Sequence, residues 1–363
     1  TNPISLGTTI GFLDNAGKNT RFFEMTAIQR EGQPDIVEQT KIVSKLFPKN
    51  IDLIANSREN SVIFFCEKDT NIIYGYRYFS SVEKRLQNAW FRWKVSGNIQ
   101  HIAMLDDALF AVIRNGTNEA GAFEDGLQKF SIKLEDSTNM LINDFQTTTT
   151  EDDIEYRIHL DNAVEVPHTD LTYDDKPGAK FTWFNLPTGF NEYQSGQLGV
   201  ILLPTGTDKT LQGMTANVWK YYDSNTNTTR IKIPGNWKTY DPQGVSDGST
   251  ADDVTPPGKL IFGYNYDMEI KLPTIYVQTA ASEGTYKAAT HSSLVIHRVK
   301  FSFGPLGVYE TTIDRIGRPS YTELYESVIA DAYSANQVQF TPDSKTTVPI
   351  YERNTHLTLT VKS

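Results

Sequence analysis

The runs of neighbouring acids in this sequence are where catalytic chemistry would be sought first. Glu151, Asp152 and Asp153 are consecutive, and glycoside cleavage needs two carboxyl groups flanking one bond. Consecutive acids on a loop are more often only solvated, so we expect no catalysis there. Asp241 and the acids of 247–253 offer oxygen ligands for a cation, but they lack the spacing of a calcium-binding loop. Neither group predicts an active site or a metal site.

Histidine and cysteine chemistry is also weakly indicated. None of the six histidines forms a His-Glu-x-x-His pair or another short metal-ligand spacing, and the Gly-x-Ser-x-Gly and phosphate-loop motifs are absent. The single cysteine, Cys66, excludes an intramolecular disulfide and lies in the apolar run 62–66. That setting favours a buried core thiol and fits a cell interior or a particle assembled there. The sequence therefore predicts no catalytic residue, no metal and no cofactor.

One aromatic segment, formed by Trp90, Phe91, Arg92 and Trp93, is distinctive. Indole rings with an arginine between them can stack on nucleic-acid bases. They equally suit a strand whose apolar side packs within a β-propeller, with Arg92 stacked on or paired near the rings. We favour the second interpretation and expect these four residues to pack inside a propeller blade.

The aromatic segment lies within a repeat of 48 residues. The matched positions are Ile51 with Ile99, Ile54 with Ile102, Glu59 with Asp107, Val62 with Phe110, and Phe64 with Val112. Each copy continues into an alternating strand, at 72–79 and at 127–134, which predicts one buried and one solvated face. A repeat of this length is typical of one propeller blade. The acid at each turn is expected to cap backbone N–H groups of a hairpin.

The rest of the chain also predicts strands. Segments 223–229 and 240–258 are rich in turn residues, and short strands recur from 259 onward, as in a sandwich or half-barrel. We therefore predict an all-β fold with few short helices, the clearest at 38–46. The expected domains are a propeller-like unit at 1–175, a loop-rich β insertion at 176–258 and a second β-unit at 259–363. Since the last strand runs almost to the final residue, we expect the polypeptide to continue.

Negative charge is concentrated in one segment. The chain has 34 basic and 44 acidic residues, a net charge of −10. Residues 135–175 contain twelve acids and one base, so this segment alone carries −11 and the remainder is close to neutral. Such a field opposes tight binding of nucleic acid at this surface. A solvated acidic loop and a surface that faces a polyanion without holding it both fit this composition.

Four stretches carry a family resemblance: 13–25, 56–62, 78–93 and, near the end, 347–354. They resemble the tail tubular protein B family, the nozzle proteins of short-tailed bacteriophages of the Autographiviridae type. The resemblance is strong over 8–115 and about 295–361, and weak over 175–260. Members of this family are usually much longer than this chain, so we expect a truncated polypeptide.

The resemblance implies a structural protein of the virion tail, assembled in the host cytoplasm. Nozzle proteins form a sixfold ring below the adaptor ring of tail tubular protein A, help to hold the tail fibre protein, and enclose the channel for DNA ejection. The implied partners are thus further copies of the chain, adaptor, fibre and passing double-stranded DNA, without membrane insertion. Because an acidic lumen repels phosphates, we expect Glu151, Asp152, Asp153 and Glu155 to face the channel.

Two other functional classes remain open. A glycan-binding or glycan-degrading β-protein of a phage or bacterial surface would use Tyr221, Tyr222 and Trp237 to stack on sugars. A propeller scaffold for protein partners is the other alternative. We favour the structural tail component and predict no enzymatic activity.

Overall fold

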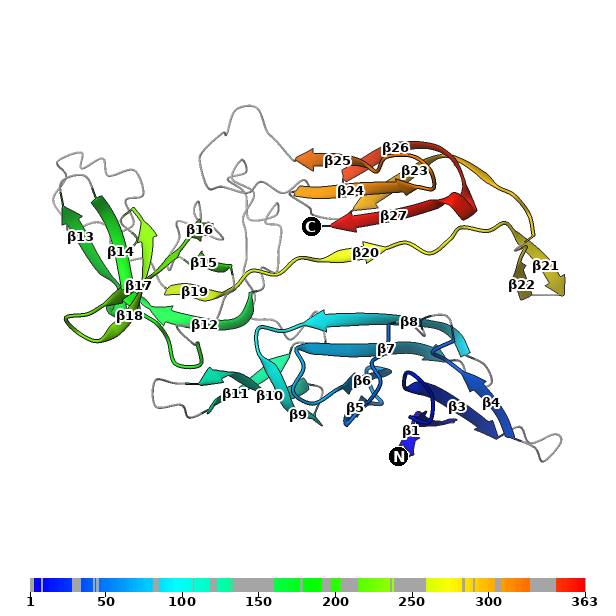
Figure 1. The fold of residues 1–363 in the computed structure, drawn as a ribbon, viewed down its shortest axis with the longest axis horizontal. Helices are drawn as coiled ribbons and strands as arrows, with labels where there is room; N and C mark the ends of the chain where they lie inside the picture. Colours follow the sequence, from blue (N-terminus) through cyan, green and yellow to red (C-terminus); the bar gives the residue numbers. More distant parts are fainter. Residues whose placement is uncertain are drawn as a thin grey trace, which may run out of the picture.

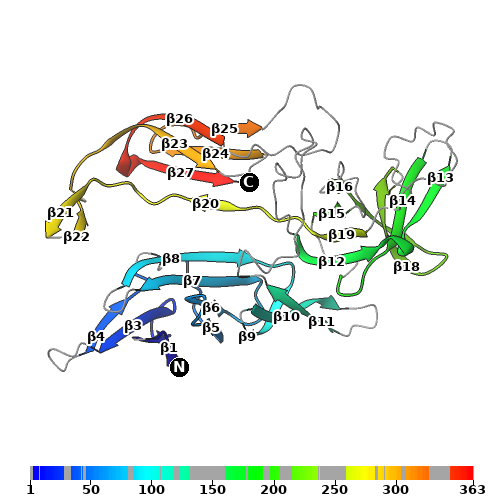
Figure 2. The same ribbon diagram turned by 180° about the vertical axis from the view of Figure 1, so that it is seen from behind.

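The structure is a computed structural model. It describes residues 3–7, 9–27, 34–41, 43, 46–80, 85–106, 108–117, 123–130, 132, 160–176, 179–190, 197–203, 215–235, 237, 259–282, 285–289, 291–303, 308–326 and 344–362. Over these residues the fold is all-β, as the sequence predicts, with antiparallel strand pairs and two 3-10 turns, η2 (His168–Asp170) and η3 (Asn354–His356). The strands form three groups, β1–β11, β12–β19 and β20–β27, which both views of the ribbon separate clearly (Figures 1 and 2).

The first group contains three consecutive antiparallel sheets, which we call the first, second and third blades. The first blade is β1 (Ile4–Ser5), β2 (Thr9–Asp14), β3 (Arg21–Ala27) and β4 (Pro34–Glu38); the second is β5 (Leu53–Ser57), β6 (Val62–Cys66), β7 (Ile72–Ser80) and β8 (Arg85–Lys94); the third is β9 (Asn98–Leu105), β10 (Ala108–Thr117) and β11 (Phe123–Phe130). In each blade, every strand pairs with the next strand along the chain. The blades are therefore successive meanders.

The first strands of the three blades lie side by side. The Asn56 side chain of β5 donates a hydrogen bond to the Ser5 carbonyl of β1 at 2.7 Å, and β5 also runs beside β9. Sheets arranged in this way around their innermost strands are the building principle of β-propellers. The described blades form an open arc, and a closed propeller stays a prediction.

The predicted repeat holds in the first strand of each copy and shifts in the second. Ile54 of β5 pairs with Phe65 of β6. Ile102 lies 48 residues after Ile54, but it pairs with Ala111 of β10, which lies only 46 residues after Phe65. The residues of β6 and β10 that occupy equivalent positions are thus 46 residues apart, two fewer than the repeat of 48 predicts.

Turn length explains the shift. In the second blade, four residues (58–61) connect the paired ends of β5 and β6, whereas 106–107 connect β9 to β10. The matches of Val62 with Phe110 and of Phe64 with Val112 are therefore wrong; in register, Phe64 corresponds to Phe110. The turn cap also differs from the prediction.

The hydroxyl of Ser57, rather than the Glu59 carboxylate, accepts the backbone N–H of Asn60, at 3.2 Å. The second predicted capping acid, Asp107, lies outside the described residues.

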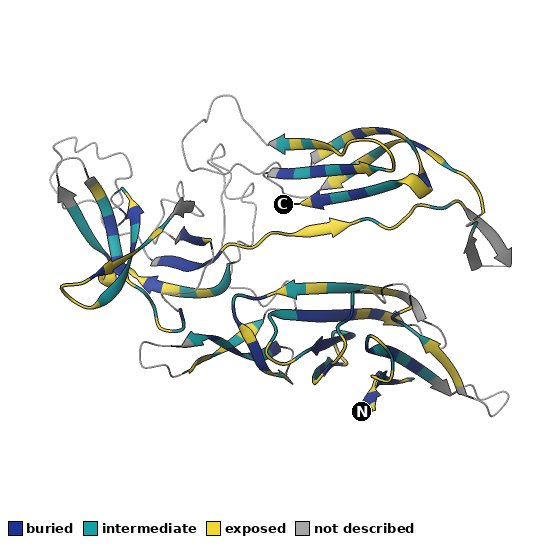
Figure 3. Cartoon of the chain, viewed as in Figure 1, coloured by how far each residue is buried: buried dark blue, intermediate teal, exposed yellow. Residues whose placement is uncertain are grey.

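Large apolar side chains fill the space between neighbouring blades. All five residues of β6 are buried, and much of β7 is also dark blue in Figure 3. Ile63 and Phe65 pack with Phe22 of the first blade, whereas Phe64 packs with Leu109 of the third. Because side chains alternate along a strand, each blade has a front face toward the following blade and a back face toward the preceding one.

The second group consists of two four-stranded sheets around one core. Their strands are β12 (Asp161–Pro167), β19 (Lys259–Tyr264), β15 (Leu198–Leu203) and β16 (Thr215–Asn217), and β13 (Thr172–Lys176), β14 (Ala179–Asn185), β18 (Thr228–Pro234) and β17 (Trp219–Asp223). Phe184 of one sheet and Phe262 of the other meet edge to face at 5.5 Å. The first sheet joins strands from all three segments proposed as domains, and that division stays a prediction.

The third group contains the C-terminal strands. They are β20 (Glu269–Lys271), β21 (Gln278–Ser282), β22 (Thr285–Ala288), β23 (Val295–Phe303), β24 (Val308–Arg315), β25 (Tyr321–Glu326), β26 (Ser344–Arg353) and β27 (Leu357–Lys362). The sheet β20-β27-β24-β25 and the pair β23-β26 share a core in which Ile313, Val348 and Leu359 are buried. These two layers form a sandwich.

Over the described residues of 38–46, strand and turn are found in place of the predicted helix. Residues 34–38 pair with β3, so Glu38 ends a strand. Beyond it, the N–H of Val43 bonds to the Thr40 carbonyl and that of Leu46 to the Val43 carbonyl, at 2.9 and 2.8 Å. Bonds over three residues make turns, and the pairing of β4 outweighs the helical spacing of the apolar residues.

Candidate functional site

The aromatic segment singled out in the sequence lies on β8, the outer strand of the second blade. Trp90 is on the back face, where its ring lies 4.5 Å from that of Tyr76 and 4.9 Å from that of Phe47. Its indole N–H donates to the Gln39 carbonyl at 3.1 Å. Trp90 therefore joins β8 to the chain that follows the first blade.

Phe91 and Trp93 extend from the same strand to the front face. Trp93 lies 5.3 Å from Phe64 and stacks on Phe130 of the third blade at 5.9 Å, with an interplanar angle of 3°. Gly75 of β7 stands opposite Phe91, and a Cβ atom there would approach the ring to 2.0 Å. The glycine leaves room for the ring, so one strand supplies aromatic side chains to both spaces between blades.

Arg92 has a different setting from the three rings. Its side chain is exposed, and it pairs across the sheet with Tyr74. Burial raises the pKa of Tyr74, and the nearby charge of Arg92 opposes that rise. Because Trp90, Phe91 and Trp93 each contact other aromatic rings of the protein, the segment is not a free platform for stacking on bases.

Cys66 is buried at the end of β6. Burial raises the pKa of its thiol to about 12. A thiol in this state is neither a nucleophile nor a metal ligand at neutral pH, which agrees with the core role expected from the sequence.

The proposed channel-facing acids Glu151, Asp152, Asp153 and Glu155 lie outside the described residues, as do Asp241 and the acids of 247–253. Of the same acidic segment, Glu165 on β12 and Asp170 in η2 are described, and both are exposed. The described end of the acidic segment therefore presents negative charge at the surface.

The residues considered for sugar stacking do not form one surface. Trp237 is buried, and its indole N–H donates to the Pro234 carbonyl at 2.6 Å. Tyr221 and Tyr222 are both exposed, but as successive residues of β17 they point to opposite faces of the sheet. At most one of these three side chains can contribute to any single platform.

Sequence reasoning missed a row of aromatic and basic side chains on one face of the sheet β13-β14-β18-β17. The Arg230 guanidinium lies 3.9 Å from the centre of the Trp183 ring, and the Lys232 ammonium lies 3.8 Å from that of Tyr221. Trp219, paired with Lys232, is exposed. The alternation of aromatic or basic residues with other residues along Trp219–Asp223 and Thr228–Pro234 was the signal available in the sequence. The register that pairs these two strands cannot be read from one sequence.

Sequence reasoning also missed a polar junction between the first and second groups. The Asn115 side chain of β10 and that of Asn162 of β12 both donate to the Gly189 carbonyl. Next to them, Asp161 accepts hydrogen bonds from Ser96, which lower its pKa, but burial is the larger effect and raises it. The junction therefore contains a carboxyl group whose charged form is disfavoured.

The described residues contain no group of three or more His, Cys, Asp or Glu side chains able to hold a metal ion. Among the same residues, no helix is both long and apolar enough to cross a membrane.

Comparison with protein families matches the chain to the model described as bacteriophage nozzle protein, over residues 1–363. No curated protein matches the chain. The family match confirms the resemblance read from the sequence and makes the protein a component of the phage tail, while the Autographiviridae type and the truncation stay predictions. An all-β chain of stacked sheets, matched by this family from its first residue to its last, belongs to the bacteriophage nozzle proteins.

Proposed function

We propose that the chain is one wall segment of a sixfold nozzle ring that docks on the adaptor, helps to hold the tail fibres and encloses the DNA ejection channel. The observation that carries this proposal is the family match over all 363 residues. Assembly in the host cytoplasm and the absence of enzymatic activity belong to the same proposal. Nothing in this role requires a reaction at the protein; it requires a shape that holds under load.

The packing of the blades suits such a wall. The space on each side of the second blade is filled by large side chains from two blades, among them Phe22, Phe65, Trp90 and Trp93. Protein interiors packed to this degree have low compressibility and transmit strain. Sheets that share such cores move together, which is what the wall of a conduit needs.

In this proposal, the acidic segment gives the lumen a negatively charged surface. Residues 135–175 alone carry a net charge of −11, whereas the whole chain carries −10 because the remaining residues are close to neutral. Duplex DNA is a polyanion, and proteins bind it by placing Lys and Arg against its phosphates. A lumen lined with carboxylates lacks that attraction and repels the duplex. Screening limits the effect to about 8 Å at physiological salt, so the acids must line the channel closely.

Charge reversal in assembled particles tests the lumen proposal. Changing Glu151, Asp152 and Asp153 together to Lys is expected to slow or arrest DNA ejection, because three carboxylates become phosphate-binding sites. Ejection triggered in vitro and followed with a DNA-binding dye gives the rate. Raising the salt concentration should partly restore the rate, since phosphate contacts weaken with salt.

The matched control reverses three exposed acids elsewhere in the chain, Asp35, Glu59 and Asp267. It changes the net charge by the same amount and is expected to leave ejection unaffected. Unchanged ejection in the first variant, or equal slowing in both, would reject a channel-facing position for the acidic segment.

Electron microscopy of the protein mixed with its adaptor tests the ring separately. Sixfold rings are expected; failure to form them with a properly folded chain would reject the ring and leave the lumen question open. A release assay on bacterial surface polysaccharide tests the glycan alternative, which the dispersed positions of Tyr221, Tyr222 and Trp237 already disfavour.

A further inference from the structure

The sheet β13-β14-β18-β17 of the second group has one face in the core and one face pointing away from it (Figure 1). Phe184, Ile231 and Ile233 pack in the core. Because side chains alternate along a strand, the residues next to them point outward. These outward residues include six aromatic or basic side chains, whose surface we call the aromatic–basic face: Phe181, Trp183, Trp219, Tyr221, Arg230 and Lys232.

Strand register places these side chains in adjoining rows. Lys232 of β18 is paired with Trp183 of β14 on one side and with Trp219 of β17 on the other. Arg230 is paired in the same way with Tyr221. Since the two tryptophans stand two strand spacings apart, their Cα atoms are separated by roughly 10 Å. A disaccharide unit of a polysaccharide chain spans a similar distance.

The cations of this face are packed against its rings. The Lys232 ammonium lies 3.8 Å from the centre of the Tyr221 ring. The Arg230 guanidinium lies 3.9 Å from the centre of the Trp183 ring and forms an ion pair with Asp223 at 2.8 Å. Such contacts are attractive because a cation lies over the negative face of a π-system. The rings are therefore held in one arrangement before any ligand arrives.

Several groups of this face keep capacity for a ligand. Trp219 and Tyr221 are 57% and 45% exposed. Within the described part of the chain, Lys232 has aromatic neighbours but no carboxylate partner. The indole N–H of Trp183 and the Nε–H of Arg230 are shielded from water and have no acceptor among the described residues. Because shielded donors normally have an acceptor, this face is short of acceptor oxygens.

The matching ligand combines apolar ring faces, acceptor oxygens and negative charge. The C–H face of a sugar ring packs on an indole or phenol ring, and the carboxylate of a sugar acid is a charged acceptor for an ammonium group. Sugar hydroxyls can donate to the carboxylates of Asp174 and Asp223, which lie on the same face. We propose that the aromatic–basic face binds an acidic polysaccharide, with sugar rings on Trp219 and Tyr221 and a sugar carboxylate at Lys232.

A single strand of DNA is the competing ligand, because it also combines rings with negative charge. Its deoxyribose–phosphate backbone has no hydroxyl group to donate to Asp174 and Asp223, so these carboxylates only repel it. Proteins that bind such strands use positively charged grooves, whereas this face has as many carboxylates as cations. The observations therefore favour the polysaccharide.

Polysaccharide binding adds a property to the proposed wall of the channel, and it requires neither the sixfold ring nor cleavage of the glycan. Affinity electrophoresis of the full chain in gels containing polygalacturonate, alginate or hyaluronate is the first test. At least one of these acidic polysaccharides is expected to retard the chain. Neutral dextran and an oligodeoxythymidylate should bind at least about tenfold more weakly. Retardation by none of the three, or tighter binding of the oligonucleotide or of dextran, would overturn the proposal.

Trp219→Ala tests the position of the sugar rings. Loss of the exposed indole is expected to raise the dissociation constant of the retarding polysaccharide at least about tenfold. Tyr222→Ala is the matched control, because Tyr222 is 48% exposed on the same strand but points to the opposite face. It should leave the dissociation constant unchanged, and an equal rise in both variants would contradict the assigned face.

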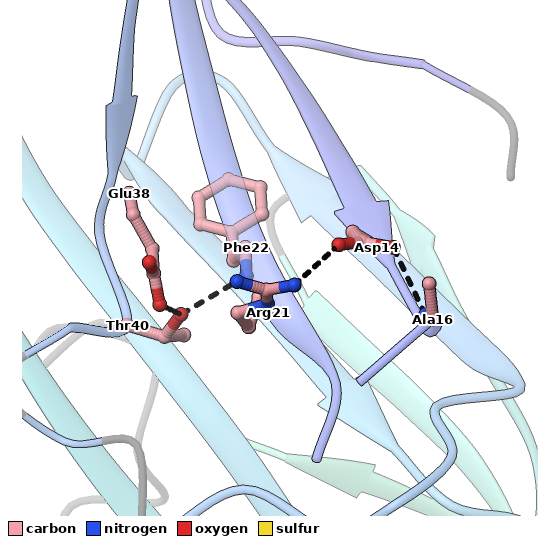
Figure 4. Close-up of polar contacts among 6 residues, drawn as sticks. All are labelled: Asp14, Ala16, Arg21, Phe22, Glu38 and Thr40. Atoms are coloured by element: carbon pink, nitrogen blue, oxygen red, sulfur yellow. Dashed lines mark hydrogen bonds and ion pairs between the residues drawn. The ribbon is translucent and has the colours of Figure 1, made fainter. Parts of the chain in front are cut away.

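Lys232→Met tests the carboxylate contact, since it keeps an apolar stem over the rings and removes the charge. The dissociation constant should rise about tenfold and lose most of its dependence on salt. Arg21→Met is the control for loss of a cation elsewhere: Arg21 pairs with Asp14 at 3.0 Å (Figure 4) and lies 5.7 Å from the centre of the Phe23 ring, on the first blade. Unchanged salt dependence in Lys232→Met, or an equal rise in Arg21→Met, would refute the contact.

Circular dichroism checks that the variants fold. Should Trp219→Ala or Lys232→Met unfold, hydrogen exchange of the unmodified chain decides. Amides of β17 and β18 should exchange more slowly in the presence of the retarding polysaccharide, because the ligand stabilises the sheet that binds it. Equal exchange rates with and without the polysaccharide would also overturn the proposal.

Discussion

Trp90 is the side chain whose loss should weaken the arc of blades most clearly. Its ring contacts Phe22, Phe47, Phe65 and Tyr76 at centroid distances between 4.5 and 6.1 Å. Truncation of a buried Trp to Ala costs about 3–5 kcal/mol, and the partial exposure of Trp90 places it at the lower end. The Gln39 carbonyl also loses its donor, which costs about 1 kcal/mol where water does not replace it. Trp90→Ala is therefore expected to destabilise the arc by about 3–4 kcal/mol.

Hydrogen exchange of the β6 amides is the appropriate assay. A chain with three groups of strands need not unfold in one step, whereas exchange of residues 62–66 reports opening of the second blade itself. A loss of about 3 kcal/mol corresponds to exchange roughly a hundredfold faster. Trp90→Phe keeps a ring but loses the indole N–H, so we expect a loss of about 1–2 kcal/mol.

Arg92→Ala is the control on the same strand and the same face. Arg92 is exposed, so its removal should change stability by about 0.5 kcal/mol or less. The packing argument fails if Trp90→Ala speeds exchange in β6 by less than threefold, or by no more than Arg92→Ala does.

Gly75, Cys66 and Asp161 supply three further predictions. Gly75→Ala inserts a methyl group into the Phe91 ring and should destabilise the second blade by about 1–3 kcal/mol in the same exchange assay; unchanged exchange would refute the close contact. Cys66, with a pKa near 12, should resist a thiol reagent at neutral pH until denaturant is added; rapid labelling of the native chain would contradict its burial. Burial raises the pKa of Asp161 in the folded state above its value in the unfolded state. The contribution of Asp161 to the stability of the fold is therefore most favourable at a pH below the unfolded-state pKa, and it is lost as the pH rises through the folded-state pKa. Asp161→Asn should therefore gain stability relative to the unmodified chain as pH rises, and parallel melting-temperature profiles would count against this.

The blades were predictable because their signals are local. Alternation at 72–79 and the apolar run at 62–66 give β7 and β6 directly, and the recurrence of Ile51 and Ile54 as Ile99 and Ile102 shows that two units share a plan. The displaced register of the second strands escaped because turn length, rather than apolar pattern, sets it. A gap of two residues keeps the same face buried, so the pattern alone cannot detect it.

Features that depend on pairing between distant segments could not be predicted. Strand β19, at 259–264, inserts between β12 and β15, and only the resulting sheet gathers the core around Phe262. The same holds for the cation–aromatic row of Arg230 and Trp183, whose contact depends on the register of β14 with β18. Local alternation identifies such strands as strands without identifying their partners.

Apolar contacts between the blades and polar contacts at the junction of the first and second groups resist deformation to different degrees. Separating the blades exposes the apolar side chains around Phe65 and Trp93 to water, and the free-energy cost grows with the area exposed. At the junction of the first and second groups, the Asn115 and Asn162 amides bond to the Gly189 carbonyl, and water can replace such hydrogen bonds at a small net cost. A load transmitted through the chain therefore meets more resistance between the blades than at this polar junction.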